Sequence, residues 1–236
     1  MWGVIMEKEA LKLEKDEIMN FLLPFFQNQK NEKIRNYKIL NQFVQKGKIL
    51  FVGSSLMENF PINELQQTLD KTICIYNRGV GGFTTTELLA SMEECIFELE
   101  PAKIFINIGT NDIGSPGYKK EVLLANYDTI LTRIGEKLPD SKVYVMAYYP
   151  INAKADFPPI DKSTKDEMFK TRTNQAIYDA NESIQELAKK HGFEFINVNN
   201  GLMDSEGNLK EEYAIDGIHM FANGYRVVLN NLKEYL

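Results

Sequence analysis

Residues 49–55 constrain the possible fold more than any other stretch of this chain. Four apolar residues, Ile-Leu-Phe-Val, run directly into Gly53 and a pair of hydroxyl residues, Ser54 and Ser55. A continuous apolar run of this length that ends at glycine is typical of a strand buried on both faces of a parallel sheet. The residue after such a strand lies at the carboxyl edge of the sheet, where open α/β folds bind their ligands. A serine at that position is either a turn residue or a nucleophile.

Segments with the pattern of strands alternate with segments that have the pattern of helices. This βαβαβαβαβα order predicts an α/β domain over residues 47–236, in which a five-stranded parallel sheet lies between helices on both faces. We therefore expect a three-layer α/β/α sandwich. The expected strands are 48–53, 72–77, 103–108, 142–148 and 193–198, and the main expected helices are 84–99, 118–137, 165–190 and 222–235.

Residues 1–46 precede this domain and have charged and apolar residues at helical spacing. Pro24 is expected to kink or split this segment, so the pattern predicts an N-terminal arm of two or three helices. The arm would pack on the flank of the domain or on a partner, and it offers a surface that a homodimer could use.

Composition and charge narrow the location and partners of the chain. With 236 residues and a net charge of −6, the chain has no cluster of Lys or Arg that would suit nucleic acid or an anionic membrane surface. The apolar start, residues 1–6, is too short for a secretory signal or a membrane span. Cys74 is expected in a strand and Cys95 in a helix, which predicts two free and mostly buried thiols. We expect a cytoplasmic protein with neither nucleic acid nor membrane as its partner.

Polar residues that could carry chemistry follow the predicted strands. Ser55 follows the first strand, a glycine-rich turn at 79–82 follows the second, and Asn111 follows the third. Asp216 and His219 lie on the loop between the fifth strand and the last helix. The carboxyl ends of parallel strands meet at one edge, so these loops should converge there.

These residue types fit nucleophilic acyl transfer. A serine nucleophile needs an imidazole within hydrogen-bond reach, and the imidazole needs a carboxylate that fixes its tautomer. His219 and Asp216 are three residues apart and can project from one side of a turn. The N–H groups of Ser55 and Gly82 and the side-chain amide of Asn111 are suitable donors to an oxyanion.

Four short motifs also carry a family resemblance over about residues 48–228. The chain resembles the GDSL-type esterases and lipases of the SGNH hydrolase superfamily, and most closely the branch of the platelet-activating-factor acetylhydrolase catalytic subunits. The motifs are Gly53-Ser54-Ser55, the segment 77–84 (Asn-Arg-Gly-Val-Gly-Gly-Phe-Thr), Gly109-Thr110-Asn111-Asp112 and Asp216-Gly217-Ile218-His219.

The resemblance implies a flavodoxin-like fold and a serine esterase without cofactor or metal. It implies Ser55 as nucleophile, His219 as base and Asp216 as the residue that orients His219. Gly82, Asn111 and Ser55 would form the oxyanion hole. Two positions depart from the family pattern, because Ser54 and Phe83 stand where Asp is usual. These departures concern the pocket and leave the expected catalytic groups in place.

The connection 149–164 suggests the size of the substrate. It follows the fourth strand and should rise beside the same sheet edge as Ser55. We expect Phe83, Tyr149 and Phe157 to line a small apolar pocket that accepts short-chain carboxylic esters. The natural ester stays open and could be a sugar ester, a lipid fragment or a thioester.

Other interpretations remain open at this point. A flavodoxin-like ligand-binding module without chemistry would have a similar layer order. An α/β-hydrolase would need a second glycine after Ser55, where Met57 stands. A metal-dependent phosphoesterase on Asp112, Asp216 and His219 would lack further ligands. Ser54 is the alternative nucleophile, and His191 is expected to be structural at a helix end.

Overall fold

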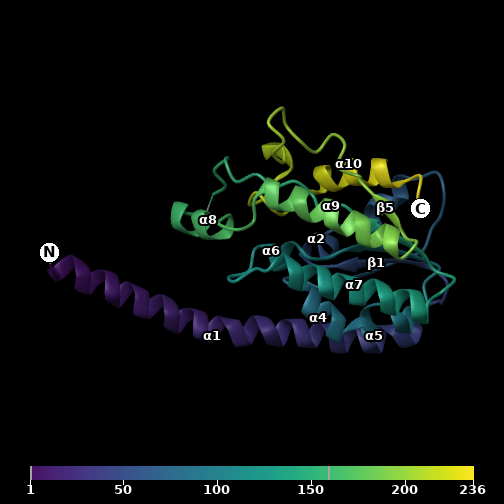
Figure 1. Cartoon of the computed structure of the whole chain (residues 1–236), viewed down its shortest axis with the longest axis horizontal. Coiled ribbons are helices and arrows are strands. Elements are labelled where there is room, and N and C mark those ends of the chain that lie inside the picture. Colours follow the sequence, from purple (N-terminus) through teal and green to yellow (C-terminus); the bar gives the residue numbers. More distant parts are fainter. Residues whose placement is uncertain (1, 159) are drawn as a thin grey trace.

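The computed structural model describes the backbone of residues 2–158 and 160–236, and the side chains of these residues except 2–16 and 19. Met1, in the expected arm, and Pro159, in the expected 149–164 connection, lie outside the described residues. A five-stranded parallel sheet with strand order β2-β1-β3-β4-β5 forms the centre of the molecule (Figure 1). The strands are β1 Ile49–Gly53, β2 Ile75–Gly79, β3 Lys103–Asn107, β4 Lys142–Met146 and β5 Glu194–Ile196.

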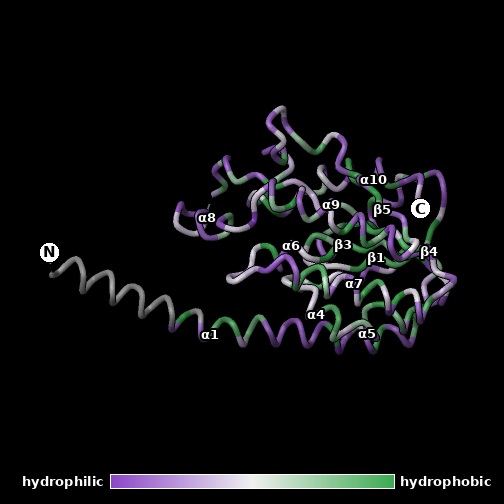
Figure 2. Tube along the Cα trace, in the orientation of Figure 1, coloured by the Kyte–Doolittle hydropathy of each residue, from purple (hydrophilic) through white to green (hydrophobic). Residues whose placement is uncertain are grey.

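The strands are buried because their side chains pack into two apolar cores on opposite faces of the sheet. Leu50 and Val52 of β1 belong to one core, and Phe51 between them belongs to the other. β3 repeats this alternation in register, since Phe51 lies opposite Phe105. Figure 2 shows hydrophobic chain concentrated in and around the sheet. The three-layer α/β fold expected from the sequence is confirmed.

Helices cover both faces of the sheet. The core around Leu50 is closed by the C-terminal part of α1 Trp2–Leu40 and by α4 Thr85–Ala90, α5 Met92–Cys95, α7 Lys120–Lys137 and α9 Asn174–Lys190. The core around Phe51 is closed by α2 Ser55–Glu58, α3 Ile62–Leu65 and α10 Ala222–Leu232. Two further helices, α6 Thr110–Ile113 and α8 Lys162–Met168, lie in the connections after β3 and β4, and the 3-10 turns are Asn41–Phe43, Gln66–Thr68, Phe97–Leu99 and Glu211–Tyr213.

The N-terminal arm is a single helix, so the prediction of two or three helices was wrong. α1 continues through Pro24 and extends beyond the α/β domain at its N-terminal end (Figure 1). A proline inside a helix costs about 3 kcal/mol, but the flanking Leu, Gln, Glu and Lys residues are strong helix formers on both sides. Several apolar side chains of this arm are exposed, namely Ile18, Phe21, Leu23, Phe25 and Phe26.

Other boundaries also differ from the sequence pattern, including the fourth and fifth strands, which end at Met146 and Ile196, two residues earlier than expected. β2 begins at Ile75, three residues later than expected, and extends to Gly79. The expected helix 84–99 is broken at Ser91 and at Ile96, where the backbone leaves helical geometry, although its apolar side stays buried throughout. The expected helix 165–190 is two helices, because the Thr173 side chain caps a new start at α9.

The two cysteines are free, as expected, but only one of them is buried. Cys95 lies in α5 inside the core, where burial raises the pKa of its thiol to about 12. Cys74 precedes β2 and is exposed, because the strand begins one residue after it. Within the part of the chain that the structure describes, no helix is both long and apolar enough to cross a membrane.

Candidate active site

Ser55 is the first residue of α2 and is separated from the end of β1 by Ser54 alone. The chain turns sharply here, and two glycines make room for the turn. A Cβ on Gly53 would lie 2.0 Å from the Asn107 carbonyl oxygen, and one on Gly79 would lie 2.2 Å from the Glu58 nitrogen. β1 lies between β2 and β3, where the strand order reverses. Ser55 therefore stands at the topological switch point, the usual ligand position in such sheets.

A chain of hydrogen bonds joins Ser55 to the loop before α10. Ser55 Oγ lies 2.8 Å from His219 Nε2, and His219 Nδ1 lies 2.6 Å from Asp216 Oδ2. When Nδ1–H donates to the carboxylate, Nε2 is left as an acceptor that can take the serine proton. The arrangement is thus able to turn a serine hydroxyl into a nucleophile.

The turn at residues 216–219 holds the imidazole and the carboxylate together. Asp216 Oδ1 accepts the N–H groups of Ile218 at 2.8 Å and His219 at 2.7 Å. Gly217 has φ +85°, and a Cβ there would lie 2.3 Å from the Asn152 carbonyl oxygen. Only glycine fits this close approach and this left-handed conformation. The two hydrogen bonds to Asp216 Oδ1 and the close packing at Gly217 together fix the conformation of this turn.

Asp216 stays ionised because the turn solvates its carboxylate. Burial alone would raise the pKa of Asp216. The hydrogen bond and the charge of the His219 side chain, together with the N–H groups of His219 and Ile218, outweigh burial and lower this pKa below its ordinary value. A carboxylate that remains charged can hold the imidazole in one tautomer and stabilise its protonated form.

The three donors expected to form an oxyanion hole each keep at least one hydrogen without an acceptor among the described residues. Among the described residues, the N–H groups of Ser55 and Gly82 have no hydrogen-bond acceptor. Asn111 Nδ2 donates one hydrogen to the Phe83 carbonyl at 3.0 Å and keeps a second one. Gly82 has φ +72°, which turns the glycine-rich segment at this point. These are the donors that an oxyanion hole needs.

Arg172 orients the Asn111 amide. Its Nη2 donates to Asn111 Oδ1 at 3.2 Å, and its Nε donates to the Thr110 carbonyl at 3.0 Å. The guanidinium lies over Gly114, where a Cβ would come within 2.2 Å of Nη2. Arg172 lies between α8 and α9, at the break in the expected helix 165–190. No local pattern pointed to this residue, because it comes from a segment about sixty residues away.

The GDSL-like Lipase/Acylhydrolase family model matches residues 51–227, which include this site. The chain belongs to the GDSL-like lipase/acylhydrolase family. It is therefore a carboxylic ester hydrolase with the SGNH-type α/β fold. The family and enzyme class expected from the four motifs are confirmed.

Individual relatives give further context for this acylhydrolase. It is 30% identical over 248 residues to the N-acylneuraminate cytidylyltransferase of Escherichia coli O18:K1:H7, covering 98% of this chain and 52% of that protein. The chain thus spans about half the length of that relative. Human platelet-activating factor acetylhydrolase IB subunit alpha2 is 24% identical over 189 residues, which cover 80% of this chain and 75% of that protein.

A solved structure extends this similarity to nearly the whole acylhydrolase. A Streptococcus pneumonia protein, described provisionally as a platelet activating factor, superposes with a TM-score of 0.82 at 30% identity. The match covers 93% of this chain and 98% of that chain.

The two positions that depart from the family pattern have different surroundings. Ser54 is fully buried, and its Oγ has no hydrogen-bond partner among the described residues. His219 Nε2 is bonded to Ser55, the other serine of the pair. Phe83 is buried in the core, and its carbonyl accepts from Asn111.

The residues expected to line a substrate pocket are packed more tightly than a rim would be. Phe83, Tyr149 and Phe157 are all buried, at 3%, 1% and 7% exposed. Phe157 packs beside the turn at residues 216–219, since its ring would lie 3.2 Å from a Cβ on Gly217. Phe83 belongs to the core around Leu50, whereas Tyr149 and Phe157 belong to the core around Phe51. Buried in this way, the three side chains do not line an open cleft.

His191 and Asp112 have partners away from Ser55. His191 follows the last residue of α9, and its Nε2 lies 2.6 Å from Oδ1 of Asp128 in α7. Asp112 accepts the Thr85 N–H at 2.9 Å, and burial raises the pKa of Asp112 despite its bonds from Thr85. Across the described residues, no group of three His, Cys, Asp or Glu side chains is arranged to hold a metal ion.

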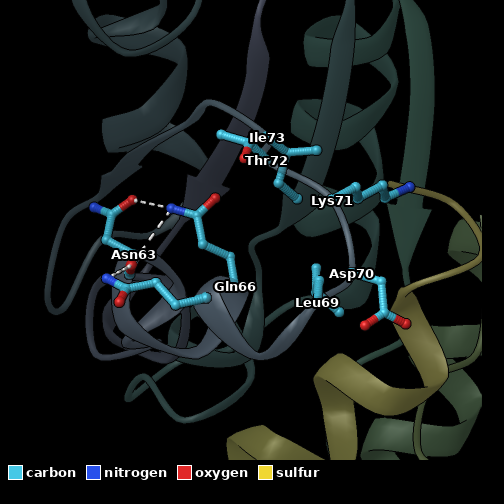
Figure 3. Close-up of a pocket in the computed structure, with 8 residues that line it drawn as sticks. Asn63, Gln66, Leu69, Asp70, Lys71, Thr72 and Ile73 are labelled. Carbon is cyan, nitrogen blue, oxygen red and sulfur yellow. Dashed lines mark hydrogen bonds between the residues drawn. The ribbon is translucent and has the colours of Figure 1, made fainter.

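The surface has a cleft that contains none of the site residues and another that adjoins the Ser55 region. One of about 590 Å³ is lined by Asn63, Gln66, Gln67 and residues 69–73, ahead of β2 (Figure 3). It contains none of the site residues. The other, of about 430 Å³, is lined by Glu58 and Val80, by Gly81 and Gly82, and by α1 residues that include Phe26 and Lys30. Gly81 lies next to Ser55, since its Cβ position is 4.0 Å from the Ser55 Cβ.

Proposed function

We propose that this acylhydrolase cleaves short-chain carboxylic esters through an acyl-enzyme on Ser55. The observation that carries the proposal is the hydrogen-bonded chain from Ser55 Oγ through His219 to Asp216, at 2.8 and 2.6 Å. A non-catalytic ligand-binding module of the same fold has no need to align these three groups.

The first half-reaction forms the acyl-enzyme. Ser55 Oγ attacks the ester carbonyl carbon while His219 Nε2 takes its proton. The carbonyl oxygen becomes an oxyanion and accepts hydrogen bonds from Ser55 N–H, Gly82 N–H and Asn111 Nδ2. The C–O bond to the leaving group then breaks, and protonated His219 gives its proton to the departing alkoxide, which leaves as an alcohol.

The second half-reaction releases the acid. Water attacks the acyl carbon and gives a proton to His219, which returns it to Ser55 Oγ as the bond to the serine breaks. Asp216 keeps its charge throughout and stabilises the imidazolium. Every step is a proton or acyl transfer, so the proposed mechanism needs no cofactor.

Two observations support a short acyl group. Phe83, Tyr149 and Phe157 are buried close to the loops that carry the site, and this packing limits the room for a long acyl chain. The human relative is named as an acetylhydrolase, whose acyl group has two carbons. We do not assign the alcohol part of the natural ester.

Labelling with a fluorophosphonate followed by peptide mapping tests this function. We expect covalent modification at Ser55, loss of labelling in Ser55→Ala and strongly reduced labelling in His219→Ala. A protein that stays unlabelled, or that is labelled at Ser54, would overturn the assignment. Activity that chelator abolishes would instead favour metal-dependent hydrolysis.

A further inference from the structure

Helix α1 contacts the loop that carries the proposed oxyanion donor Gly82. The segment 79–83, which runs from the last residue of β2 toward α4, is called the oxyanion turn below. Figure 1 shows the C-terminal part of α1 running alongside α4 and α5. Three α1 side chains reach the turn or the residue that holds it, and they are Lys30, Lys33 and Tyr37.

Lys30 holds the carbonyl that follows the oxyanion donor. Its Nζ donates to Gly82 O at 2.9 Å and pairs with Glu87 Oε1 at 2.7 Å. Glu87 Oε2 in turn accepts the Thr84 N–H at 2.9 Å, as part of the capping box of α4. Lys30 is only 20% exposed and lies over the Phe83 ring. The lysine thus ties the turn both to α1 and to the start of α4.

Lys33 acts through Glu58 on Gly81, the residue before the proposed donor Gly82. Glu58 accepts the Gly81 N–H with one oxygen and pairs with Lys33 through the other. Glu58 is the last residue of α2, the helix that begins at Ser55. Tyr37 adds a third contact, since its hydroxyl donates to Gly79 O at 2.7 Å. The Gly81 N–H is therefore set by α2 and α1 together.

The peptide unit between these anchors carries the Gly82 N–H. It is flanked by Gly81 and Gly82, whose backbones have more conformational freedom than those of other residues. The unit before it is held at the Gly81 N–H, and the unit after it is held at Gly82 O and at the Phe83 N–H, which donates to Val80 O at 3.1 Å. The direction of the Gly82 N–H is thus fixed from outside the glycine pair.

We propose that α1 is part of the catalytic apparatus, with Lys30 and Lys33 as positioning residues for the oxyanion donor Gly82. The proposal rests on the proposed acyl-transfer function, and neither lysine touches the reacting atoms. An oxyanion donor acts only in the transition state, where a well-placed hydrogen bond lowers the barrier. A lysine that keeps this donor in place should therefore affect kcat more than KM.

Substitution of Lys30 tests the proposal on the full chain with p-nitrophenyl acetate. Lys30→Met keeps the length of the side chain but removes its charge and its donors. We expect kcat to fall about tenfold with KM within about twofold, because loss of a complete donor costs on the order of 10²–10³. Lys30→Arg retains a donor of similar reach and should restore most of kcat.

Lys38→Met is the matched control on the same helix. Lys38 is exposed, and among the described residues it has no hydrogen-bond or ion-pair partner. Lys38→Met should keep the wild-type kcat. Lys33→Met gives a second route, because it acts through Glu58 and should also lower kcat. Circular dichroism and thermal unfolding of each variant establish that it is folded.

The outcomes separate this proposal from the proposed function. If Ser55→Ala remains active, the proposed function fails whatever Lys30 does. If Ser55→Ala is inert but folded Lys30→Met and Lys33→Met keep the wild-type kcat, only the positioning role is overturned. A change confined to KM would also overturn it, since the lysines would then contact substrate.

Discussion

Arg172 Nη2 donates a hydrogen bond to Asn111 Oδ1 at 3.2 Å, and it is 61 residues away in the chain. This bond fixes which end of the Asn111 amide carries the donor. Arg172 holds Oδ1 and Phe83 O holds one Nδ2 hydrogen, so the second Nδ2 hydrogen can point in only one direction. The orientation of a proposed oxyanion donor thus depends on a residue outside the four motifs.

Removal of Arg172 should therefore weaken catalysis through Asn111. We expect Arg172→Met to lower kcat about tenfold with little change in KM, because the amide loses its orientation in the transition state. Gly114→Ala should have a similar effect, since its Cβ would displace the guanidinium. Steady-state kinetics with p-nitrophenyl acetate measures both. A change in KM alone would show that Arg172 binds substrate.

Loss of the Asn111 amide should be more severe than loss of its support. Asn111→Ala removes the donor, and we expect kcat to fall on the order of 10²–10³ while KM changes little. If Arg172 acts only through Asn111, the double variant Asn111→Ala/Arg172→Met should be no slower than Asn111→Ala alone. Additive losses in the double variant would mean that Arg172 has a separate role.

The two adjacent serines should respond in opposite ways to substitution by alanine. Ser54 is fully buried with an Oγ that lacks a hydrogen-bond partner in the described structure, so Ser54→Ala removes a desolvated hydroxyl. We expect Ser54→Ala to keep its activity and to be as stable as the wild type or up to about 1 kcal/mol more stable. Ser55→Ala should be folded and nearly inert.

Urea unfolding and ester hydrolysis of the two serine variants check this prediction. The reverse result, with Ser54→Ala inert and Ser55→Ala active, would exchange their roles. Loss of activity in both variants, with both folded, would indicate that Ser54 also contributes to the site.

The pH dependence should separate Asp216 from His219. The pKa of Asp216 is lowered by its bonds to His219 and Ile218, which outweigh burial. Asp216 is therefore ionised throughout the range from pH 5 to 8, where histidine side chains typically change charge. We expect kcat/KM to fall as the pH is lowered from 8 to 5, because a protonated imidazole cannot accept the serine proton. A flat profile over this range would contradict the role of His219.

The lowered pKa of Asp216 also predicts how the stability of the fold depends on pH. A carboxylate whose pKa is lower in the folded state stabilises the fold above its unfolded pKa, about 3.9, and loses this contribution as the pH falls through the folded value. Asp216→Asn should remove that part of the acid sensitivity and also lower kcat, by on the order of 10⁴, through the wrong tautomer. Urea unfolding between pH 6 and 2 measures the difference.

The main features of the fold could be predicted because they depend on local periodicity. Apolar runs such as residues 49–52 and the βα alternation predict a parallel sheet, and the loops after the strands place Ser55, Asn111, Asp216 and His219 at one edge. The structure brings Ser55, His219 and Asp216 together at hydrogen-bond distances.

Features set by long-range contacts could not be predicted in this way. Lys30 and Arg172 contact the site across 52 and 61 residues, and neither belongs to a motif. The continuity of α1 through Pro24 depends on helix propensity on both sides of the proline. A local pattern could have indicated a role for Glu58 near the site, because Glu58 lies one helical turn after Ser55. The use of the N-terminal arm by a second copy of the chain stays a prediction.

The length of the acyl chain is the last expectation to test. Phe157 is 7% exposed and packs against the Gly217 turn that positions Asp216 and His219. Because this aromatic packing leaves little room, kcat/KM should be highest for acetyl to butyryl esters and should fall steeply for longer chains. A series of p-nitrophenyl esters from two to twelve carbons measures this preference.

Phe157→Ala should shift that preference. It removes a buried ring, so we expect the optimum to move toward longer acyl chains and the stability to drop by about 3–5 kcal/mol. Phe221→Ala is the matched control, because Phe221 is 52% exposed and its loss should leave the profile unchanged. If the wild type prefers eight carbons or more, or if a lipid interface activates it, the aromatic packing does not set acyl length. An unchanged optimum in folded Phe157→Ala would place the acyl pocket elsewhere along the sheet edge.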